Sequence, residues 1–390
     1  MMTTYVPPLA RGDRSLVGNW FWQIDKPILA AILALILTGV ALSFASSPAA
    51  ALRDDSISGD FYYAWRMIAF ASLGLGILIT TSMLSPRHVR RVSALTFLFC
   101  IAVMCVLPIF GNEAKGATRW LAIGPFGFQP SEFVKPALIV LAAWMFAEGQ
   151  KGEGVPGMSI AFGLYAVTAG LLIIQPDIGQ TVLITTTFMA VFFMAGVPLR
   201  WMAALMAMAA AGFVAIYLTV GHVRDRIAMF IGGGEASDNF QLERAHEAIS
   251  AGGLVGRGVG EGVMKRHVPD LHTDFIYSVA AEEFGLVFSI ILISVFGLVA
   301  IRGLRRAREL ADPFEQTAAG GLFILLGLQA AINIAVNLGL APTKGMTLPF
   351  ISYGGSSMLG MCLTMGLALA LTRKRPGAYE PGSTPKGILG

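Results

Sequence analysis

The tetrapeptide His-Thr-Asp-Phe at 272–275 places Asp274 where a long polar stretch meets a new apolar run that begins near Ser278. A carboxylate at the centre of a membrane-spanning helix costs about 2.5 kcal/mol or more, and the cost is smaller near the membrane surface. An Asp at such a boundary therefore needs a partner or a chemical task. We predict that Asp274 is the catalytic residue of a membrane enzyme.

Two cationic side chains and a carboxylate stand near the start of an earlier apolar run. Arg119 is followed by Gln-Pro-Ser-Glu at 129–132, and Lys135 comes three residues later. Glu132 and Lys135 would share a helix face and could pair. Two interpretations stay open. One is a structural ion pair that lets the helix begin below the lipid headgroups; the other is an anion site in which Arg119 and Lys135 bind a group such as pyrophosphate.

Other polar residues at the ends of apolar runs suggest helix starts and interior positions. Asp177, with a Gln three residues on, has the spacing of a helix N-cap. Asp274 could itself be the N-cap of the helix that follows it, or Thr273 could be the cap, which would leave Asp274 in the first turn. Glu282 and Glu283 lie two turns deeper and directly precede apolar sequence, so at least one of them should face the bundle interior or a water-filled cavity.

Two segments rich in glycine or proline break the pattern of spans. The alternating glycines of 256–262 do not match the dinucleotide-binding fingerprint. They indicate either a compact series of turns or a backbone that approaches a phosphate or sugar closely. Residues 342–357 contain two prolines and a Gly pair. They form either a plain loop before the last span or a cavity wall on which Lys344, Tyr353 and Ser356 donate hydrogen bonds.

The composition indicates a protein that crosses a membrane several times. Of its 390 residues, 55% are hydrophobic and 13% are charged, whereas soluble domains have about 25% charged residues. The net charge of +4 arises from basic short loops, which set membrane topology, so binding to nucleic acid is not indicated. The three cysteines fall within apolar runs, and no His or Cys spacing predicts a metal site.

About ten apolar runs are long enough to span a bilayer, which predicts an all-α integral membrane protein. Basic loops lie on the side of both termini, and the positive-inside rule places that side in the cytoplasm. The stretch 221–277 is then one long extracytoplasmic loop between helices 7 and 8, with a helix from Asp238 to about Ala251. The predicted spans are Ile28–Ser47, Ala64–Met83, Val92–Phe110, Ser131–Ala147, Met158–Ile174, Ile178–Ala195, Trp201–Val220, Ser278–Ile301, Ala318–Leu338 and Ser352–Leu371.

The chain divides into three parts at this level. We expect a cytoplasmic segment at 1–26, a transmembrane domain at 27–373, and a cytoplasmic tail at 374–390 whose Pro and Gly content indicates disorder. The first apolar run has basic flanks, as a signal peptide does, but its length favours an uncleaved first helix.

At its polar motifs the chain resembles the SEDS family (shape, elongation, division and sporulation) of polytopic cell-wall polymerases. The motifs follow the family's order: Arg119-Trp120 with Gln129-Pro130-Ser131-Glu132, then His272-Thr273-Asp274-Phe275, then Pro349-Phe350-Ile351-Ser352-Tyr353-Gly354-Gly355-Ser356. Residues 342–349 look more like the division members of the family than the elongation members. One departure is the Val-Pro-Asp at 268–270, where relatives often have Leu-Pro-Glu, so we expect no essential role for Asp270.

The resemblance implies a ten-helix fold and peptidoglycan glycosyltransferase activity on lipid II, with Asp274 at the position of the family's catalytic Asp. It also implies a class B penicillin-binding protein as transpeptidase partner, other membrane proteins of the divisome, and a location in the bacterial cytoplasmic (inner) membrane at the septum. Inversion at the anomeric carbon needs a base, for which Asp274 is the candidate. Arg119 and Lys135 would stabilise the departing pyrophosphate, alone or with Mg²⁺ or Mn²⁺ bound to its oxygens.

Alternatives from other classes stay open on the sequence. A lipid II flippase would explain Lys135, Glu282 and Glu283 equally well, but explains an Asp on the external face less well. An elongation-type polymerase differs from the division type at only a few residues, and a scaffold for division proteins would leave the polar clusters without a task. The predicted substrate-binding residues are Arg119, Gln129, Glu132, Lys135, His272, Thr273, Lys344, Tyr353 and Ser356.

Overall fold

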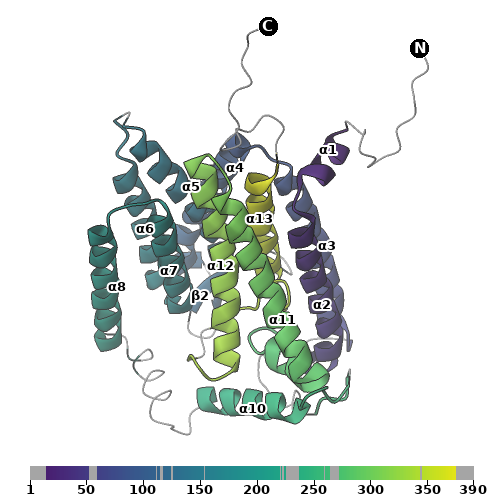
Figure 1. Ribbon diagram of the computed structural model, residues 1–390. Helices are drawn as coiled ribbons and strands as arrows, with labels where there is room; N and C mark the ends of the chain where they lie inside the picture. The colour runs from purple at the N-terminus through teal and green to yellow at the C-terminus, as the bar shows by residue number, and fades with distance from the viewer. Residues whose placement is uncertain are drawn as a thin grey trace, which may run out of the picture.

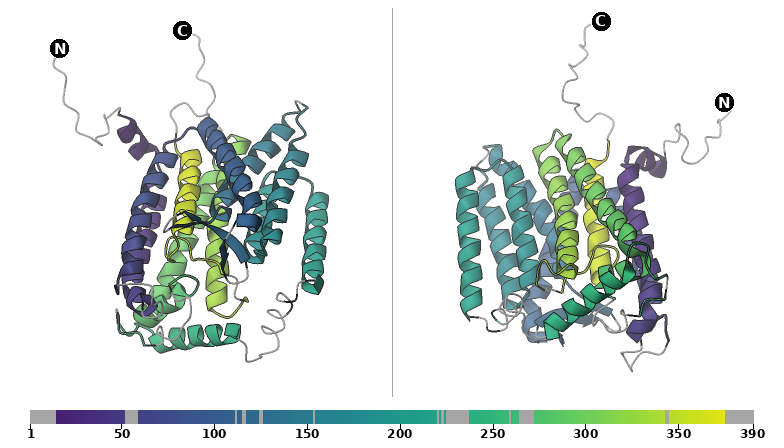
Figure 2. Two further views of the ribbon diagram at one scale, coloured as in Figure 1. Left: turned by 180° about the vertical axis from the view of Figure 1, so that it is seen from behind. Right: turned by 60° about the horizontal axis from the view of Figure 1, so that its bottom comes forward.

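The computed structural model is a bundle of roughly aligned helices with one small sheet and one helix lying across an end (Figures 1 and 2). The structure describes residues 15–51, 59–110, 112–114, 117–123, 126–152, 154–219, 221, 224, 237–258, 260–263, 272–342 and 345–374. The helices are α1 (Leu16–Gln23), α2 (Lys26–Ala51), α3 (Tyr62–Ser82), α4 (Pro86–Phe110), α5 (Ser131–Gln150), α6 (Gly157–Ile174), α7 (Ile178–Met194), α8 (Leu199–Thr219), α10 (Ser237–Gly252), α11 (Ile276–Arg308), α12 (Pro313–Asn337) and α13 (Gly355–Thr372).

Each predicted span falls on one helix of the bundle, which confirms the prediction of a helical membrane protein. Within the described residues, seven helices are long and apolar enough to cross a membrane: α2, α3, α4, α6, α11, α12 and α13. Helix α5 carries three charged side chains, α7 has 17 residues, and only a shorter stretch of α8 is counted as apolar. The expected total of about ten crossings therefore stays a prediction.

The sequence analysis missed a small sheet between α4 and α5. Strands β1 (Asn112–Ala114), β2 (Ala117–Ile123) and β3 (Phe126–Phe128) pair in that order, and both pairs are antiparallel. The sheet packs against α4 and α13 and is seen from behind in Figure 2. It carries Arg119 towards the bundle and is an exception to the predicted all-α class.

Helices α12 and α13 form the centre of the bundle, and α8 lies at its edge (Figure 1). Nearly every side chain of α13 is buried, and this helix packs closely on α3. A Cβ on Gly366 would overlap Oγ1 of Thr81 at 1.9 Å, so glycine is required at this crossing. Small residues at helix crossings let backbones approach within a membrane, where dispersion rather than the hydrophobic effect drives helix association.

Helix α10 lies across the end of the bundle opposite the one where the described chain begins and ends (Figure 2). Its observed bounds, Ser237–Gly252, confirm the helix predicted from Asp238 to about Ala251. Ala245 and Ala248 are fully buried and face the bundle, where α10 packs on α11. The described part of the polar loop is therefore folded onto the helices.

The two ends of the described chain meet at one end of the bundle. The backbone N–H of Lys374 donates to the carbonyl of Gln23 at 3.1 Å. This agrees with an even number of crossings, while the assignment of this end to the cytoplasm stays a prediction. Within the expected 1–26 segment, helix α1 is capped by Ser15 and anchored by a 2.8 Å hydrogen bond from Trp20 Nε1 to Ser82 Oγ.

Asp25 joins the start of α2 to the end of α11. Its carboxylate accepts hydrogen bonds from Nε of Arg302 at 2.8 Å and Nε of Arg306 at 2.9 Å, and from the N–H of Ile28. Burial acts to raise the pKa of Asp25, but these donors outweigh it and hold the pKa below the ordinary value of an Asp carboxyl. A depressed carboxyl pKa stabilises the fold above the unfolded pKa, and this contribution is lost as the pH falls through the lower folded value.

We predict that Asp25→Asn lowers stability by about 1–3 kcal/mol, because charge-assisted hydrogen bonds to a buried carboxylate are lost. The measurement is the thermal unfolding midpoint of the purified protein in detergent. Glu309→Gln is the matched control: Glu309 also pairs with Arg306 at 2.8 Å, but its side chain is 60% exposed, against 4% for Asp25. Equal shifts for the two variants would show that the Asp25 contacts contribute no more than a surface pair.

Candidate active site

Asp274 lies in a turn directly before α11. Helix α11 begins at Ile276, and its N-cap residue, Phe275, makes no side-chain capping bond. The predictions that Asp274 or Thr273 caps this helix, and that Asp274 lies in its first turn, are therefore wrong. The physical reason is that the turn is held by a distant segment: Ser352 Oγ donates to the carbonyl of Thr273, and the N–H of Tyr353 donates to the carbonyl of His272 at 2.8 Å.

The backbone of Asp274 is fixed by two amides of α12. Nδ2 of Asn333 and Nδ2 of Asn337 donate to the Asp274 carbonyl at 3.0 and 2.9 Å. Oδ1 of Asn337 in turn accepts a 2.8 Å hydrogen bond from Ser278 Oγ. Sequence analysis missed both asparagines, although two buried amides four residues apart in an apolar helix are a usable signal for a polar site.

The Asp274 carboxylate and the Arg119 guanidinium approach the same backbone position. An ideal Cβ on Gly345 would lie 3.7 Å from Asp274 Oδ2 and 4.0 Å from Arg119 Nη1. Asp274 is only partly buried, so solvent or a substrate can reach this group of atoms. Gly345 has φ = 59°, a left-handed conformation that side chains rarely adopt. The segment after α12 thus lies beside Asp274, but Lys344 itself is outside the described residues.

The turn between α6 and α7 fixes the Arg119 side chain. Its Nη2 donates to the carbonyl of Pro176 at 3.0 Å, and its Nε lies 3.5 Å from Oδ2 of Asp177. Oδ1 of Asp177 accepts from the N–H of Gln180, which confirms the predicted helix cap. Burial raises the pKa of Asp177, and the Arg119 charge opposes that rise. The Arg119 side chain stays 24% exposed, although its Nε is buried.

Aromatic and hydroxyl groups surround the turn. The His272 ring lies 4.5 Å from the Tyr63 ring and 5.6 Å from the Tyr353 ring. Burial raises the pKa of Tyr353 to about 12, so its phenol stays protonated and able to donate. Ser356 and Gln129 form contacts to each other: Ser356 Oγ accepts from the N–H of Gln129 at 3.0 Å and donates to the carbonyl of Gly127 at 3.0 Å. These bonds tie the sheet to α13.

Glu132 and Lys135 form a buried network inside the bundle. Lys135 Nζ lies 2.8 Å from Glu132 Oε2 and donates to Gln329 Oε1 at 3.0 Å. Gln180 Nε2 donates to Glu132 Oε1 at 3.0 Å. Both charged side chains are almost fully buried, so of the two interpretations left open by the sequence the geometry favours a structural ion pair. A direct contact between Lys135 and a substrate stays a prediction.

The glycine-rich segment folds onto a break in α11. Gly285 has φ = 80°, and the N–H groups of Arg257 and Gly258 donate to the carbonyls of Glu282 and Glu283, each at 3.0 Å. Both glutamates are buried, as expected for interior positions. A Cβ on Gly262 would lie 2.9 Å from Oε2 of Glu282, which places that carboxylate against the loop. These contacts favour the compact series of turns over a phosphate-lining backbone.

Comparisons with known proteins agree with these features. A family model described as cell cycle protein (FtsW, RodA and SpoVE) matches residues 26–376. "Probable peptidoglycan glycosyltransferase FtsW" of Caulobacter vibrioides is 61% identical over 370 residues, covering 95% of this chain and 94% of that protein. A chain from a peptidoglycan synthase complex that coordinates polymerization and crosslinking superposes with a TM-score of 0.72 at 25% identity, covering 90% of this chain and 97% of that chain. The rod shape determining protein RodA of Thermus thermophilus gives a TM-score of 0.66 at 26% identity, covering 90% and 96%.

We predict that Lys135→Met destabilises the fold by about 3–5 kcal/mol, because it leaves the Glu132 carboxylate buried without its counter-charge. Adding Glu132→Gln should restore much of that loss. The measurement is the thermal unfolding midpoint in detergent. Lys151→Met is the control, since Lys151 pairs with Glu148 at 3.0 Å but is 51% exposed. The structural assignment fails if the double variant is no more stable than the single one, or if Lys151→Met costs as much.

Proposed function

Since the chain belongs to the family of cell cycle proteins that includes FtsW, RodA and SpoVE, we propose that Asp274 is the general base with which it polymerises lipid II. The chain is a peptidoglycan glycosyltransferase. The observation that carries the assignment of Asp274 is its geometry. Asp274 is partly exposed, its backbone is fixed by Asn333 and Asn337, and the partly exposed Arg119 side chain approaches the same position at Gly345.

The proposed reaction is an inverting transfer between two lipid-linked sugars. The hydroxyl of the acceptor sugar forms a new bond to the anomeric carbon of the donor, and the bond from that carbon to the pyrophosphate oxygen breaks. Asp274 takes the proton of the hydroxyl, and undecaprenyl pyrophosphate leaves with the bonding electron pair. Inversion of an α-linked donor gives a β-1,4 product and needs only one base on the attacking side.

Arg119 is the described cation best placed to stabilise the leaving pyrophosphate. It approaches Asp274 across Gly345 and is partly exposed, whereas Lys135 is committed to Glu132 and Gln329. Stabilising a developing charge with a fixed donor is usually a large contribution to catalysis. A Mg²⁺ or Mn²⁺ ion would be bound with the oxygens of the substrate pyrophosphate. Within the described residues, no group of three or more His, Cys, Asp or Glu side chains could hold such an ion.

The setting we propose follows from the lipid tail and the family. The apolar helices make this a multi-pass membrane protein, and an undecaprenyl substrate requires an active site open to the bilayer. We place the Asp274 end outside the bacterial cytoplasmic membrane, at the division septum. A class B penicillin-binding protein would be the transpeptidase partner, beside other divisome membrane proteins. The similarity to a chain of a complex that coordinates polymerization and crosslinking supports that partner.

We predict that Asp274→Asn abolishes glycan strand formation, with a loss of about 10²–10⁴ in rate, because the amide cannot accept the proton. Purified protein with its transpeptidase would be given accessible lipid II, and the strands separated by gel. Asp60→Asn, an exposed carboxylate between α2 and α3, is the matched control and should retain activity. Near-normal strands from Asp274→Asn would refute its role. Translocation of lipid II across sealed vesicles without strands would support the flippase.

Asn337 is predicted to be a positioning residue. Asn337→Ala removes one of two hydrogen bonds to the Asp274 carbonyl and the acceptor of Ser278. A misplacement of about 1 Å can cost about 10²-fold in rate, so we expect kcat to fall about 10- to 100-fold with KM little changed. Gln150→Ala removes an amide-to-carbonyl bond at the opposite end of the bundle and serves as control. A rise in KM at constant kcat would contradict the positioning role.

A further inference from the structure

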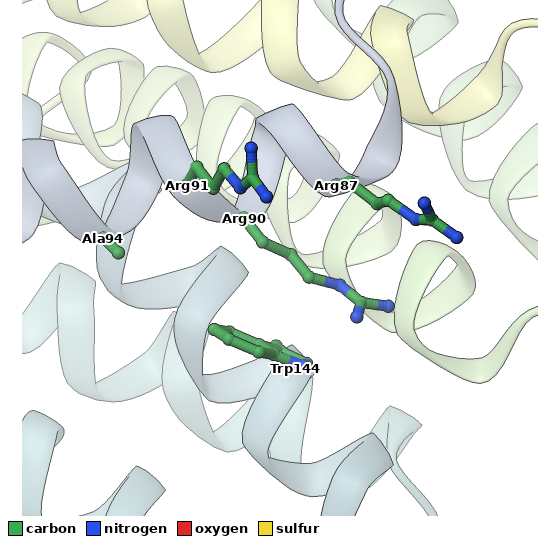
Figure 3. A pocket seen from close by; sticks show the side chains of 5 residues that line it. All are labelled: Arg87, Arg90, Arg91, Ala94 and Trp144. Atoms are coloured by element: carbon green, nitrogen blue, oxygen red, sulfur yellow. The ribbon is translucent and has the colours of Figure 1, made fainter.

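A cavity of about 370 Å³ lies beside the first turns of α4, far from Asp274, and three arginines line it (Figure 3). Its lining residues are Arg87, Arg90, Arg91, Ala94 and Trp144. We propose that this cavity binds the phosphate headgroup of an anionic membrane phospholipid. The first turns of α4 lie at the end of the bundle where the two ends of the described chain meet (Figure 1). The ligand of the cavity that they line therefore belongs to the leaflet opposite the one that faces Asp274.

The cavity carries excess positive charge. Within the part of the chain that the structure describes, neither Arg87 nor Arg91 has a carboxylate within ion-pair distance, and both are exposed. Arg90 lies 3.8 Å from Glu148, but that carboxylate also accepts hydrogen bonds from Lys151 and Trp144. One carboxylate shared among several donors does not neutralise three guanidinium groups. A phosphate offers the planar, bidentate acceptor geometry that arginine matches best.

Arg90 is fixed in place, which makes the cavity a preformed site. Its guanidinium carbon lies 4.2 Å from the Phe314 ring centre and 5.4 Å from that of Trp144. Its Nε is buried and, within the described residues, makes no hydrogen bond. A buried donor without an acceptor costs free energy. Stacking on two rings therefore positions a cation whose Nε is not used by the protein and whose Nη1 has only the 3.8 Å approach to Glu148 among the described residues.

The position of the arginines is unfavourable for the helix alone. Arg87, Arg90 and Arg91 occupy the first two turns of α4, whose first turn has no acidic residue. The N-terminal end of a helix carries partial positive charge, so cations there are repelled and anions are attracted. An anion in the cavity would be stabilised by the arginines and would also offset their repulsion with the helix end.

The surface next to the cavity favours a lipid over a soluble anion. Arg87, Arg91 and Leu95 follow one another at intervals of four residues, so they share one face of α4. That face continues as an exposed apolar surface formed by Leu95, Leu98 and Phe99, which are 69%, 66% and 60% exposed. A phospholipid places its phosphate on the arginines and an acyl chain on the apolar surface, whereas inorganic phosphate uses only the arginines. Trp144 has the amphipathic ring typical of the membrane interface.

The test compares lipid binding by two double variants of the full-length protein. Delipidated protein in non-ionic detergent is titrated with phosphatidylglycerol or phosphatidylcholine, and bound lipid is counted by native mass spectrometry. Each basic residue near a membrane surface contributes enough attraction for roughly a fivefold change in affinity. We therefore expect Arg87→Gln with Arg91→Gln to weaken phosphatidylglycerol binding about 20- to 30-fold. Arg305→Gln with Arg308→Gln removes the same charge from exposed positions at the same end of the bundle and should change it little.

A second variant tests the cavity without changing charge. Ala94→Phe should fill the space and weaken phosphatidylglycerol binding, while far-UV circular dichroism reports whether each variant is folded. The proposal is overturned if the two arginine pairs weaken binding equally, since the attraction would then be diffuse. It is also overturned if phosphatidylcholine binds to the wild type as tightly as phosphatidylglycerol does, or if inorganic phosphate displaces the lipid at millimolar concentration. A third contradicting result is that Ala94→Phe and the Arg87→Gln, Arg91→Gln variant both bind phosphatidylglycerol as tightly as the wild type does.

Discussion

The hydrogen bonds that Asn333 and Asn337 of α12 make to the carbonyl of Asp274 fix the geometry on which the rest of the site depends. The bilayer interior holds no water that could form a hydrogen bond with an unpaired polar group, so each buried donor there needs an acceptor in the protein. Gln329, Asn333 and Asn337 meet this demand together, because residues four apart lie on one face of a helix. From that face, Gln329 reaches Lys135 of α5 and the carbonyl of Thr347, and Asn333 reaches the carbonyl of Met346. One polar stripe therefore joins an internal ion pair, the segment after α12 and the turn that carries Asp274.

The polar residues around this stripe differ in burial: some are buried and support the site, and others are exposed enough to contact a substrate. Lys135 and Glu132 satisfy each other in the interior, and Gln129 and Ser356 tie the sheet to α13. Asp274 and Arg119 lie at the margin of this network and are partly exposed. Desolvation makes interior charges costly to leave unpaired, whereas groups at the margin can exchange water for a substrate. Burial therefore distinguishes the polar residues that hold the structure of the site from those that can contact a substrate.

The sequence predicts structural features that depend on neighbouring residues better than features that depend on contacts between distant residues. Apolar runs located every helix of the bundle core, and local spacing gave the Asp177 cap, the pairing of Glu132 with Lys135, and helix α10. The strands of 112–128 are too short to show a clear alternation between two spans. The cap expected at Thr273 was wrong because Ser352, 79 residues away, accounts for the bonding of that turn. The asparagine stripe was missed because it acts on residues 59 and 63 positions distant.

The break in α11 shows why the polar loop belongs to the site. Gly285 interrupts the helix, so the carbonyls of Glu282 and Glu283 lose the donors they would have within a continuous helix. The N–H groups of Arg257 and Gly258 take their place, and the N–H groups of Leu286 and Val287, freed by the same break, donate to the carbonyls of Gly253 and Leu254. The loop therefore provides hydrogen-bond partners for the two carbonyls and the two N–H groups that the break leaves open. Such partners are needed because the bilayer interior holds no water that could replace them. Because the loop is bonded on both sides of the break, the short half of α11 from Ile276 to Glu283 is fixed relative to the membrane half. The segment from Ile276 to Glu283 follows directly after the Asp274 turn, so the loop and α12 together fix the position of the carboxylate.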